Sequence, residues 1–259
     1  MFENIIEFSA EAGYIKKEKE VFPIPASQNI PDWFKKLKHK HDHPTIKGCI
    51  PFLDTLTAGY ILKLPQDYHI TCNNKVERIN EKGEKEIIRD DGQRFPFDDR
   101  LTTVNLNRGS NWEVQKKYQI EGSPIIKKNN NMKFILKIIN PWYIKTPPGY
   151  SCLFVPPLNN EKEDRFHIMP GIVDTDSYEI PINFPFVING DKYKSLNDVI
   201  PKGTPYVQVI PFKRNNWKMK IKSKNEEDAK WSIGMWRTRF IHNYKIRLGV
   251  KNHGNKRIR

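Results

Sequence analysis

The region that most constrains the fold is residues 148–214, where three apolar runs of strand length are separated by turns rich in proline and glycine. The chain there reads PPGYSCLFVPP, then MPGIVDTDSYEIPINFPFVI, then IPKGTPYVQVIPFKR. One turn carries two aspartates, Asp174 and Asp176, close to Tyr178. This layout predicts β-structure in which a polar turn is held in one place between strands.

The composition is that of a globular protein with an ample core. The chain has 259 residues, of which 37% are hydrophobic and 12% aromatic, more aromatic than a disordered chain would be. No apolar run approaches the roughly 18 residues of a membrane span. The N-terminus, MFENIIEFSAEAGY, has acidic residues where an export signal would have basic ones. Three cysteines, Cys49, Cys72 and Cys152, show no disulfide spacing. We therefore expect reduced thiols, no membrane partner and a cytoplasmic location.

Positive charge is concentrated at the C-terminus. Residues 213–259 hold 15 Lys and Arg against 3 Asp and Glu, a net charge of +12 out of +14 for the chain. The sequence thus predicts a nearly neutral β-rich body over residues 1–212 and a basic segment over residues 213–259. Such a segment favours a polyanionic partner, of which nucleic acid is the commonest in a cell. A solvated basic face and an acidic protein partner are the alternatives.

Local patterns predict individual elements of the body. Residues 31–37 (PDWFKKL) predict a short helix near the N-terminus, with proline at its start and aspartate in its first turn. Residues 59–64 and 68–72 predict two paired strands around Pro65-Gln66-Asp67. Residues 76–89 predict a second hairpin with Gly83 at its tip, and residues 133–139 predict another strand.

The basic segment has its own pattern. Residues 217–222 (WKMKIK) alternate apolar residues with lysine and predict an edge strand. Asn225 is placed as the N-cap of an amphipathic helix whose apolar stripe continues to Tyr244. Residues 251–259 have no pattern and predict a basic tail.

Common catalytic motifs are not found. The sequence has no GxxxxGK[ST], GxSxG, HExxH or zinc-type Cys/His spacing. His39, His41 and His43 alternate in KHKHDHP, a spacing that could direct three imidazoles to one metal ion. An exposed histidine-rich loop is the favoured interpretation, because no further ligand can be identified.

The aspartate turn resembles the β-rich family of dUTP pyrophosphatases and dCTP deaminases. Residues 170–178 (PGIVDTDSY) and 203–208 (GTPYVQ) are similar to two segments of that family. The resemblance implies that Asp174 is the catalytic base that activates water, with Mg²⁺ holding the triphosphate. It also implies a ligand site formed by Asp176, Tyr178 and Gln208, with the tyrosine near the sugar and the glutamine near the phosphates. The alternative, favoured on residue chemistry, is a structural turn in which the aspartates bond to nearby backbone.

The resemblance also bears on fold and assembly. It implies a single-core β-sandwich with a β-clip-like core over residues 133–212, to which the local patterns above add a short N-terminal helix and a C-terminal amphipathic helix. A homo-oligomer, specifically a trimer, is implied as well. At the level of the whole chain, the segments GCIPFLDTLTAGYILKLPQD, INPWYIKTPPGYSCLFVPPLN, PGIVDTDSYEIPINFPFVI and GTPYVQVIPFKR resemble a family of unknown function found in bacteriophages and some bacteria, which implies no activity.

Two functional hypotheses follow. The first is a phage-type cytoplasmic accessory protein that binds a nucleotide or similar small anionic ligand near Asp174; if it is an enzyme, it is a pyrophosphatase or deaminase-like hydrolase. The second is a non-enzymatic nucleic-acid-binding or virion-associated protein that uses the basic C-terminus. Its candidate phosphate contacts are Lys245, Arg247, Lys251, Lys256, Arg257 and Arg259.

Overall fold

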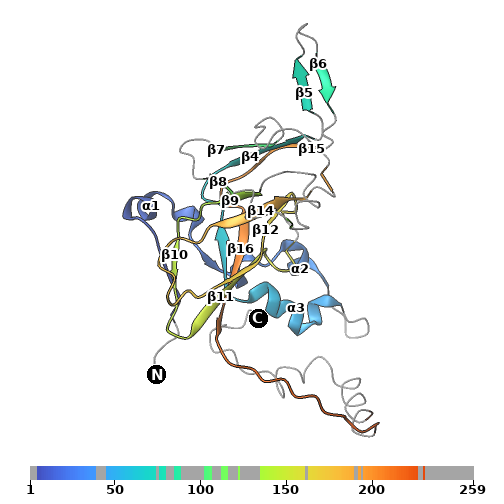
Figure 1. The fold of residues 1–259 in the computed structure, drawn as a ribbon. Coiled ribbons are helices and arrows are strands. Elements are labelled where there is room, and N and C mark those ends of the chain that lie inside the picture. The colour runs from blue at the N-terminus through green and yellow to red at the C-terminus, as the bar shows by residue number, and fades with distance from the viewer. Residues whose placement is uncertain are drawn as a thin grey trace.

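The computed structural model describes residues 5–38, 45–73, 76–79, 85–88, 102–106, 112–115, 122, 135–160, 163–189, 192–193, 195–226 and 230. These residues confirm that the protein is mainly β, with sixteen strands, three short α-helices and three 3₁₀ turns among them. Every strand pairing in this part of the chain is antiparallel. Figure 1 shows the arrangement.

The largest sheet contains three strands from residues 148–214 and two from earlier in the chain. Its strand order is β13-β11-β16-β3-β2. The central strand, β16, is the longest at nine residues and pairs with β11 on one side and β3 on the other. The five strands are β13 (Gly171–Val173), β11 (Tyr150–Val155), β16 (Pro205–Lys213), β3 (Tyr60–Lys63) and β2 (Ile24–Pro25).

The other strands form four smaller sheets. A four-stranded sheet has the order β12-β14-β9-β8, a three-stranded sheet has the order β15-β4-β7, and two pairs stand alone. The four-stranded sheet contains β12 (Phe166–Ile168), β14 (Phe184–Ile188), β9 (Ile135–Ile138) and β8 (Trp112–Gln115). The three-stranded sheet contains β15 (Ser195–Ile200), β4 (Tyr68–Asn73) and β7 (Thr102–Leu106). The pairs are β1 (Glu7–Ser9) with β10 (Tyr143–Lys145), and β5 (Val76–Ile79) with β6 (Lys85–Ile88).

One hydrophobic core joins the two larger sheets. Phe154 of β11 and Phe184 of β14 have ring centroids 5.4 Å apart, and Phe184 and Tyr206 of β16 have centroids 5.7 Å apart. Val207 and Val209 belong to the same buried cluster. Burial of these side chains supplies the main stabilisation of the sheets, at about 1.5–3 kcal/mol for each large apolar side chain.

Three short helices and three 3₁₀ turns precede β3 in the described part of the chain. They are α1 (Ala12–Lys17), α2 (Asp32–Lys36) and α3 (Ile50–Thr57), with 3₁₀ turns η1 (Lys19–Val21), η2 (Ala26–Asn29) and η3 (Ile46–Gly48). The predicted helix at residues 31–37 is confirmed as α2, which buries Phe34 and carries Asp32 in its first turn. Helices α1 and α3 were not predicted, because their apolar residues lie in short segments without a clear helical period.

The predicted hairpin at residues 59–72 is wrong in its pairing. Both strands exist, as β3 and β4, but β3 pairs with β16 and β2 while β4 pairs with β15 and β7. Between β3 and β4 the chain passes from one sheet to another. Residues 202–204 provide hydrogen-bond partners there for the backbone at the end of β3 and for the Asp67 side chain in the turn. The Leu64 N–H donates to the Thr204 carbonyl at 2.9 Å, and the Lys202 N–H donates to Asp67 Oδ1 at 2.7 Å. The predicted hairpin at 76–89 is confirmed by the β5–β6 pair, and the strand at 133–139 by β9.

The edge strand predicted at residues 217–222 is not formed. Strand β16 ends at Lys213, which lies opposite Tyr150 at the start of β11. Beyond that point neither neighbouring strand extends further, so the alternating sequence has no partner and residues 214–225 carry no strand. Of the predicted C-terminal helix, only Asn225, Glu226 and Lys230 are among the described residues. The prediction of that helix, and of the basic tail, lies outside the described part of the chain.

Candidate functional site

The aspartate turn follows β13 and is bonded to itself and to the core. The backbone N–H groups of Ser177 and Tyr178 both donate to the Asp174 carbonyl at 3.0 Å. Thr175, between the two aspartates, is fully buried, and its hydroxyl lies 2.7 Å from the Thr146 hydroxyl. The turn is therefore a rigid, internally bonded structure, as the structural interpretation of its sequence predicts.

Arg214 is the main partner of the two aspartates. Its Nη1 donates to Asp176 Oδ1 at 2.9 Å, and its Nη2 donates to Asp176 Oδ2. The Gly149 N–H also donates to Asp176 Oδ2, at 2.8 Å. The hydrogen bonds from Arg214, and then that from Gly149, lower the pKa of Asp176 to about 2. Asp176 is thus held as a carboxylate, with both oxygens occupied.

Asp174 is the more accessible of the two carboxylates. Its side chain is 60% exposed, and its Oδ1 accepts a hydrogen bond from the Ser151 hydroxyl at 2.6 Å. Arg214 Nη1 lies 3.1 Å from the same oxygen. A carboxylate between a cation and a hydroxyl can help to place a ligand, yet two protein groups already engage this oxygen.

Gln208 lies apart from the aspartates and has structural partners. It is 1% exposed, and its Nε2 donates to the carbonyls of Thr55 and Ala58 at 2.8 and 2.7 Å. Its Oε1 accepts from the Leu158 N–H at 2.8 Å. Gln208 thereby joins β16 to the end of α3 and to the loop after β11.

The spacing along β11 separates these predicted site residues. Gln208 pairs with Val155, whereas Ser151, the partner of Asp174, lies four residues earlier on the same strand. Four strand residues span about 13 Å. The structure brings Asp174 and Asp176 together with Arg214 and leaves Tyr178 exposed on the following segment, but it does not bring Gln208 to them. Arg214 was missed from the sequence; the only signal for it was a lone arginine at the end of the last apolar run.

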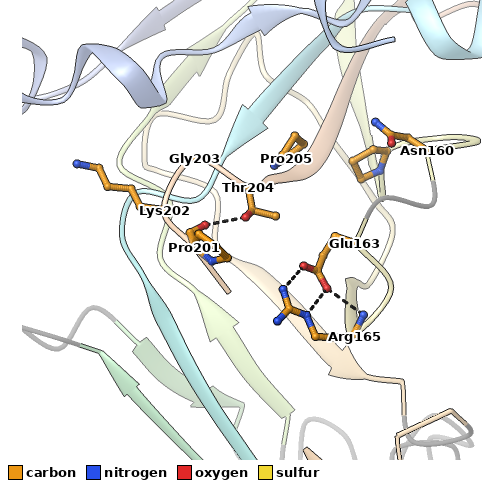
Figure 2. Close-up of a pocket in the computed structure, with 9 residues that line it drawn as sticks. Asn160, Glu163, Arg165, Pro201, Lys202, Gly203, Thr204 and Pro205 are labelled. Atoms are coloured by element: carbon orange, nitrogen blue, oxygen red, sulfur yellow. Dashed lines mark hydrogen bonds and ion pairs between the residues drawn. The ribbon is translucent and has the colours of Figure 1, made fainter. Parts of the chain in front are cut away.

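A polar pocket of about 410 Å³ lies beside the start of β16, whose first residue, Pro205, is part of the lining. Figure 2 shows Arg165 facing Glu163, while the Lys202 side chain points away from them. The pocket is lined by Pro157, Asn160, Glu163, Arg165, Pro201, Lys202, Gly203, Thr204 and Pro205.

Both cations of this pocket are paired with carboxylates. Arg165 donates through Nε and Nη2 to Glu163 at 2.9 and 2.5 Å, and through Nη1 to Asp198 at 2.6 Å. The Lys202 ammonium lies 2.5 Å from Glu18 and 2.6 Å from Glu20. The hydrogen bonds that Arg165 donates to Glu163 and Lys202 donates to Glu18 are the main reason that the pKa values of the two cations are raised. The pocket therefore offers no unneutralised cation to an anionic ligand.

The basic arm, defined here as residues 213–224, carries charge of one sign only. It contains Lys213, Arg214, Lys218, Lys220, Lys222 and Lys224 and no acidic residue. Every residue of the arm is exposed, and Figure 1 shows it leaving the sheets as an extended ribbon. Within the described residues, no carboxylate forms an ion pair with Lys218, Lys220 or Lys222.

The arm has two unlike sides. Side chains alternate across an extended chain, so Lys218, Lys220 and Lys222 share one side and the apolar residues share the other. The apolar residues are almost fully exposed: Trp217 by 89%, Met219 by 87% and Ile221 by 85%. The predicted phosphate contacts Lys245, Arg247, Lys251, Lys256, Arg257 and Arg259 lie outside the described residues.

Other predicted features can be placed only in part. The histidines of KHKHDHP lie outside the described residues, and the described part of the chain has no cluster of three or more metal-binding side chains. Cys49 and Cys152 are free thiols, and burial raises the pKa of Cys152. None of the described helices has the length and apolar character needed to cross a membrane.

Comparison with known proteins gives no family for this chain. It matches no protein-family model, and no curated protein is found that resembles it.

Proposed function

We propose that the protein is a non-enzymatic nucleic-acid-binding protein whose basic arm contacts the phosphate backbone. The observation that carries this proposal is the row of three exposed lysines, Lys218, Lys220 and Lys222, which have no carboxylate partner among the described residues. A polyanion is the ligand that such a row favours, because it can contact several cations at once and release its own counterions.

The extended form of the arm suits a linear polyanion. Lysines two residues apart on an extended chain are about 6.7 Å apart, so the row can follow consecutive phosphates of a strand. Lysine contacts phosphate as a point charge, so binding through this row is expected to be independent of base sequence.

The body of the protein presents the arm from a fixed point. The Arg214 N–H donates to the Gly149 carbonyl at 2.8 Å, and its guanidinium is paired with Asp176. The lysine row begins only four residues beyond this anchor, at Lys218. The aspartate turn then has a clear role in this proposal, which is to hold the root of the arm.

The nucleotide-binding hypothesis has weaker support from the geometry. In its favour, the Asp174 carboxylate is 60% exposed. Against it, Arg214 and Ser151 already contact Asp174, and Gln208 is buried against α3. Several expectations remain predictions from sequence alone. They are nucleotide binding, hydrolysis, Mg²⁺ use, the dUTP pyrophosphatase-like fold, a trimer, phage origin and cytoplasmic location.

The proposal is tested by the salt dependence of binding. The affinity of the full chain for a fluorescent oligo(dT) is measured by anisotropy over a range of salt concentrations. The variant Lys218→Gln/Lys220→Gln/Lys222→Gln removes three charges, and the slope of log K against log salt is expected to fall in magnitude by about 2. The control Lys16→Gln/Lys17→Gln/Lys19→Gln removes the same charge from exposed positions around α1. Equal slopes for the two variants, or no binding by the wild type at low salt, would contradict the proposal.

A further inference from the structure

We infer that the basic arm selects unpaired nucleic-acid strands over duplexes, with Trp217 as a stacking platform for a base. This inference rests on the proposed function and adds the class of nucleic acid that the arm binds. Its starting point is the second side of the arm, where Trp217, Met219 and Ile221 are almost fully exposed opposite the lysine row.

The lysine row by itself does not distinguish single strands from duplexes, since both present phosphates. The apolar side of the arm does distinguish them. In a duplex the base faces are stacked on one another, so Trp217, Met219 and Ile221 would stay in water. An unpaired strand exposes its base faces, and aromatic side chains next to cations bind such faces with little dependence on sequence. Only an unpaired strand can therefore use both sides of the arm.

Trp217 is placed where stacking requires the least ordering. It lies three residues after Arg214, whose backbone and guanidinium are both fixed to the body by Gly149 and Asp176. Met219 and Ile221 lie further from this anchor. A side chain close to a fixed point loses less conformational freedom on binding, so we expect Trp217 to contribute more than the other two.

Charge favours nucleic acid over a second copy of the chain as the partner of this side. The twelve-residue arm has six cations and no acidic residue, and the whole chain has a net charge of +14. Two arms brought together would repel each other, whereas a nucleic-acid strand brings compensating charge to the same place.

The test compares a single strand with a duplex on the same variants. Dissociation constants of the full chain are measured for oligo(dT) and for a blunt-ended duplex of two complementary strands with the same number of phosphates. Trp217→Ala is expected to weaken binding of oligo(dT) by roughly 5- to 150-fold and of the duplex by less than about twofold. Trp217→Phe keeps an aromatic face and is expected to retain most of the affinity. Thermal unfolding of each variant confirms that the fold is unchanged, as the high exposure of Trp217 implies.

Separate outcomes distinguish this inference from the proposed function. The variant Lys218→Gln/Lys220→Gln/Lys222→Gln should weaken binding of both ligands in similar proportion. If it does so while Trp217→Ala weakens neither or both equally, the inference is overturned and the proposed function stands. If the wild type binds neither ligand, both fail. A change of molecular mass in light scattering on Trp217→Ala, with unchanged binding, would overturn the inference in favour of contact between copies.

Discussion

Arg214 binds Asp176 through both carboxylate oxygens, at the point where β16 ends and the basic arm begins. This pair connects the residue that follows β16 to the turn after β13, which lies 38 positions earlier in the sequence. The Gly149 N–H donates a further hydrogen bond to Asp176 Oδ2, at 2.8 Å. The residues that sequence reasoning placed at the centre of a ligand site therefore form the anchor of the arm.

The contribution of the Arg214–Asp176 pair to the free energy of unfolding should decrease as the pH falls. Because the folded-state pKa of Asp176 is lowered to about 2, its ionised form stabilises the fold above the unfolded-state pKa of about 3.9. That contribution is lost as the pH falls from about 4 toward 2. Asp176→Asn should lower the midpoint of thermal unfolding at pH 7, and the difference from wild type should narrow below pH 4. Unfolding measured from pH 2 to 7 checks this.

Asp174→Asn is the matched control for this experiment. Its carboxylate is 60% exposed and engages Arg214 through one oxygen, so its effect at pH 7 should be the smaller of the two. An equal or larger loss for Asp174→Asn would show that Asp176 is not the main partner of Arg214.

Gln208 is expected to act on stability rather than on ligand binding. Gln208→Ala leaves the Leu158 N–H and the carbonyls of Thr55 and Ala58 without their partner in a buried place. The free energy of unfolding should fall by about 3 kcal/mol, measured by chemical denaturation. Gln28→Ala, at an exposed position in η2, should change it by less than about 0.5 kcal/mol. A stable Gln208→Ala variant that had lost nucleotide binding would instead support the nucleotide hypothesis.

Gly59 is expected to be intolerant of any side chain. It has a φ of +67°, and a Cβ atom there would lie 1.9 Å from the Val209 carbonyl oxygen of β16. Gly59→Ala must therefore displace the backbone where β3 joins β16, and we expect a loss of more than about 3 kcal/mol or no folded protein.

Gly13→Ala is the comparison for the Gly59 variant. Gly13 lies in α1 with open space around its Cα, so alanine there should leave stability unchanged or raise it by up to about 1 kcal/mol. Denaturation curves of the two variants are compared under the same conditions. Similar stabilities would contradict the close approach of β3 and β16 at Gly59.

Tyr206 carries a buried hydroxyl for which the described residues supply no hydrogen-bond partner. Burial raises the pKa of this phenol far above its usual range. Removing a hydroxyl without a partner removes the cost of desolvating it, so Tyr206→Phe should leave stability unchanged or raise it by about 1 kcal/mol. A loss of more than about 1 kcal/mol in chemical denaturation would show that the hydroxyl has a partner, such as an ordered water.

Much of the local structure could be predicted because it depends on neighbouring residues. Proline and glycine mark the turns around β11 and β16, and aspartate after proline marks the start of α2. The partners of each strand could not be predicted in the same way. β3 and β4 are adjacent in sequence yet join different sheets, since their partners β16 and β15 come from residues more than a hundred positions away.

In the candidate site, too, the local turn could be predicted and the long-range contact could not. The sequence predicts that Asp174 and Asp176 lie on a fixed turn, and the structure agrees. It does not predict that Arg214 pairs with them, because this contact joins residues 38 positions apart. The alternation of residues 217–222 predicts an edge strand, which is wrong, because alternation does not say whether a neighbouring strand is present.

The most direct test of the proposed function is a lysine footprint of the full chain with and without bound oligo(dT). Lysines are acetylated under limiting reagent at low salt, and the modified positions are quantified by mass spectrometry. We expect Lys218, Lys220 and Lys222 to lose reactivity when the strand binds and to regain it at high salt, while Lys16, Lys17 and Lys19 keep theirs throughout. Unchanged reactivity of the arm lysines while the strand is bound would show that the arm does not contact it.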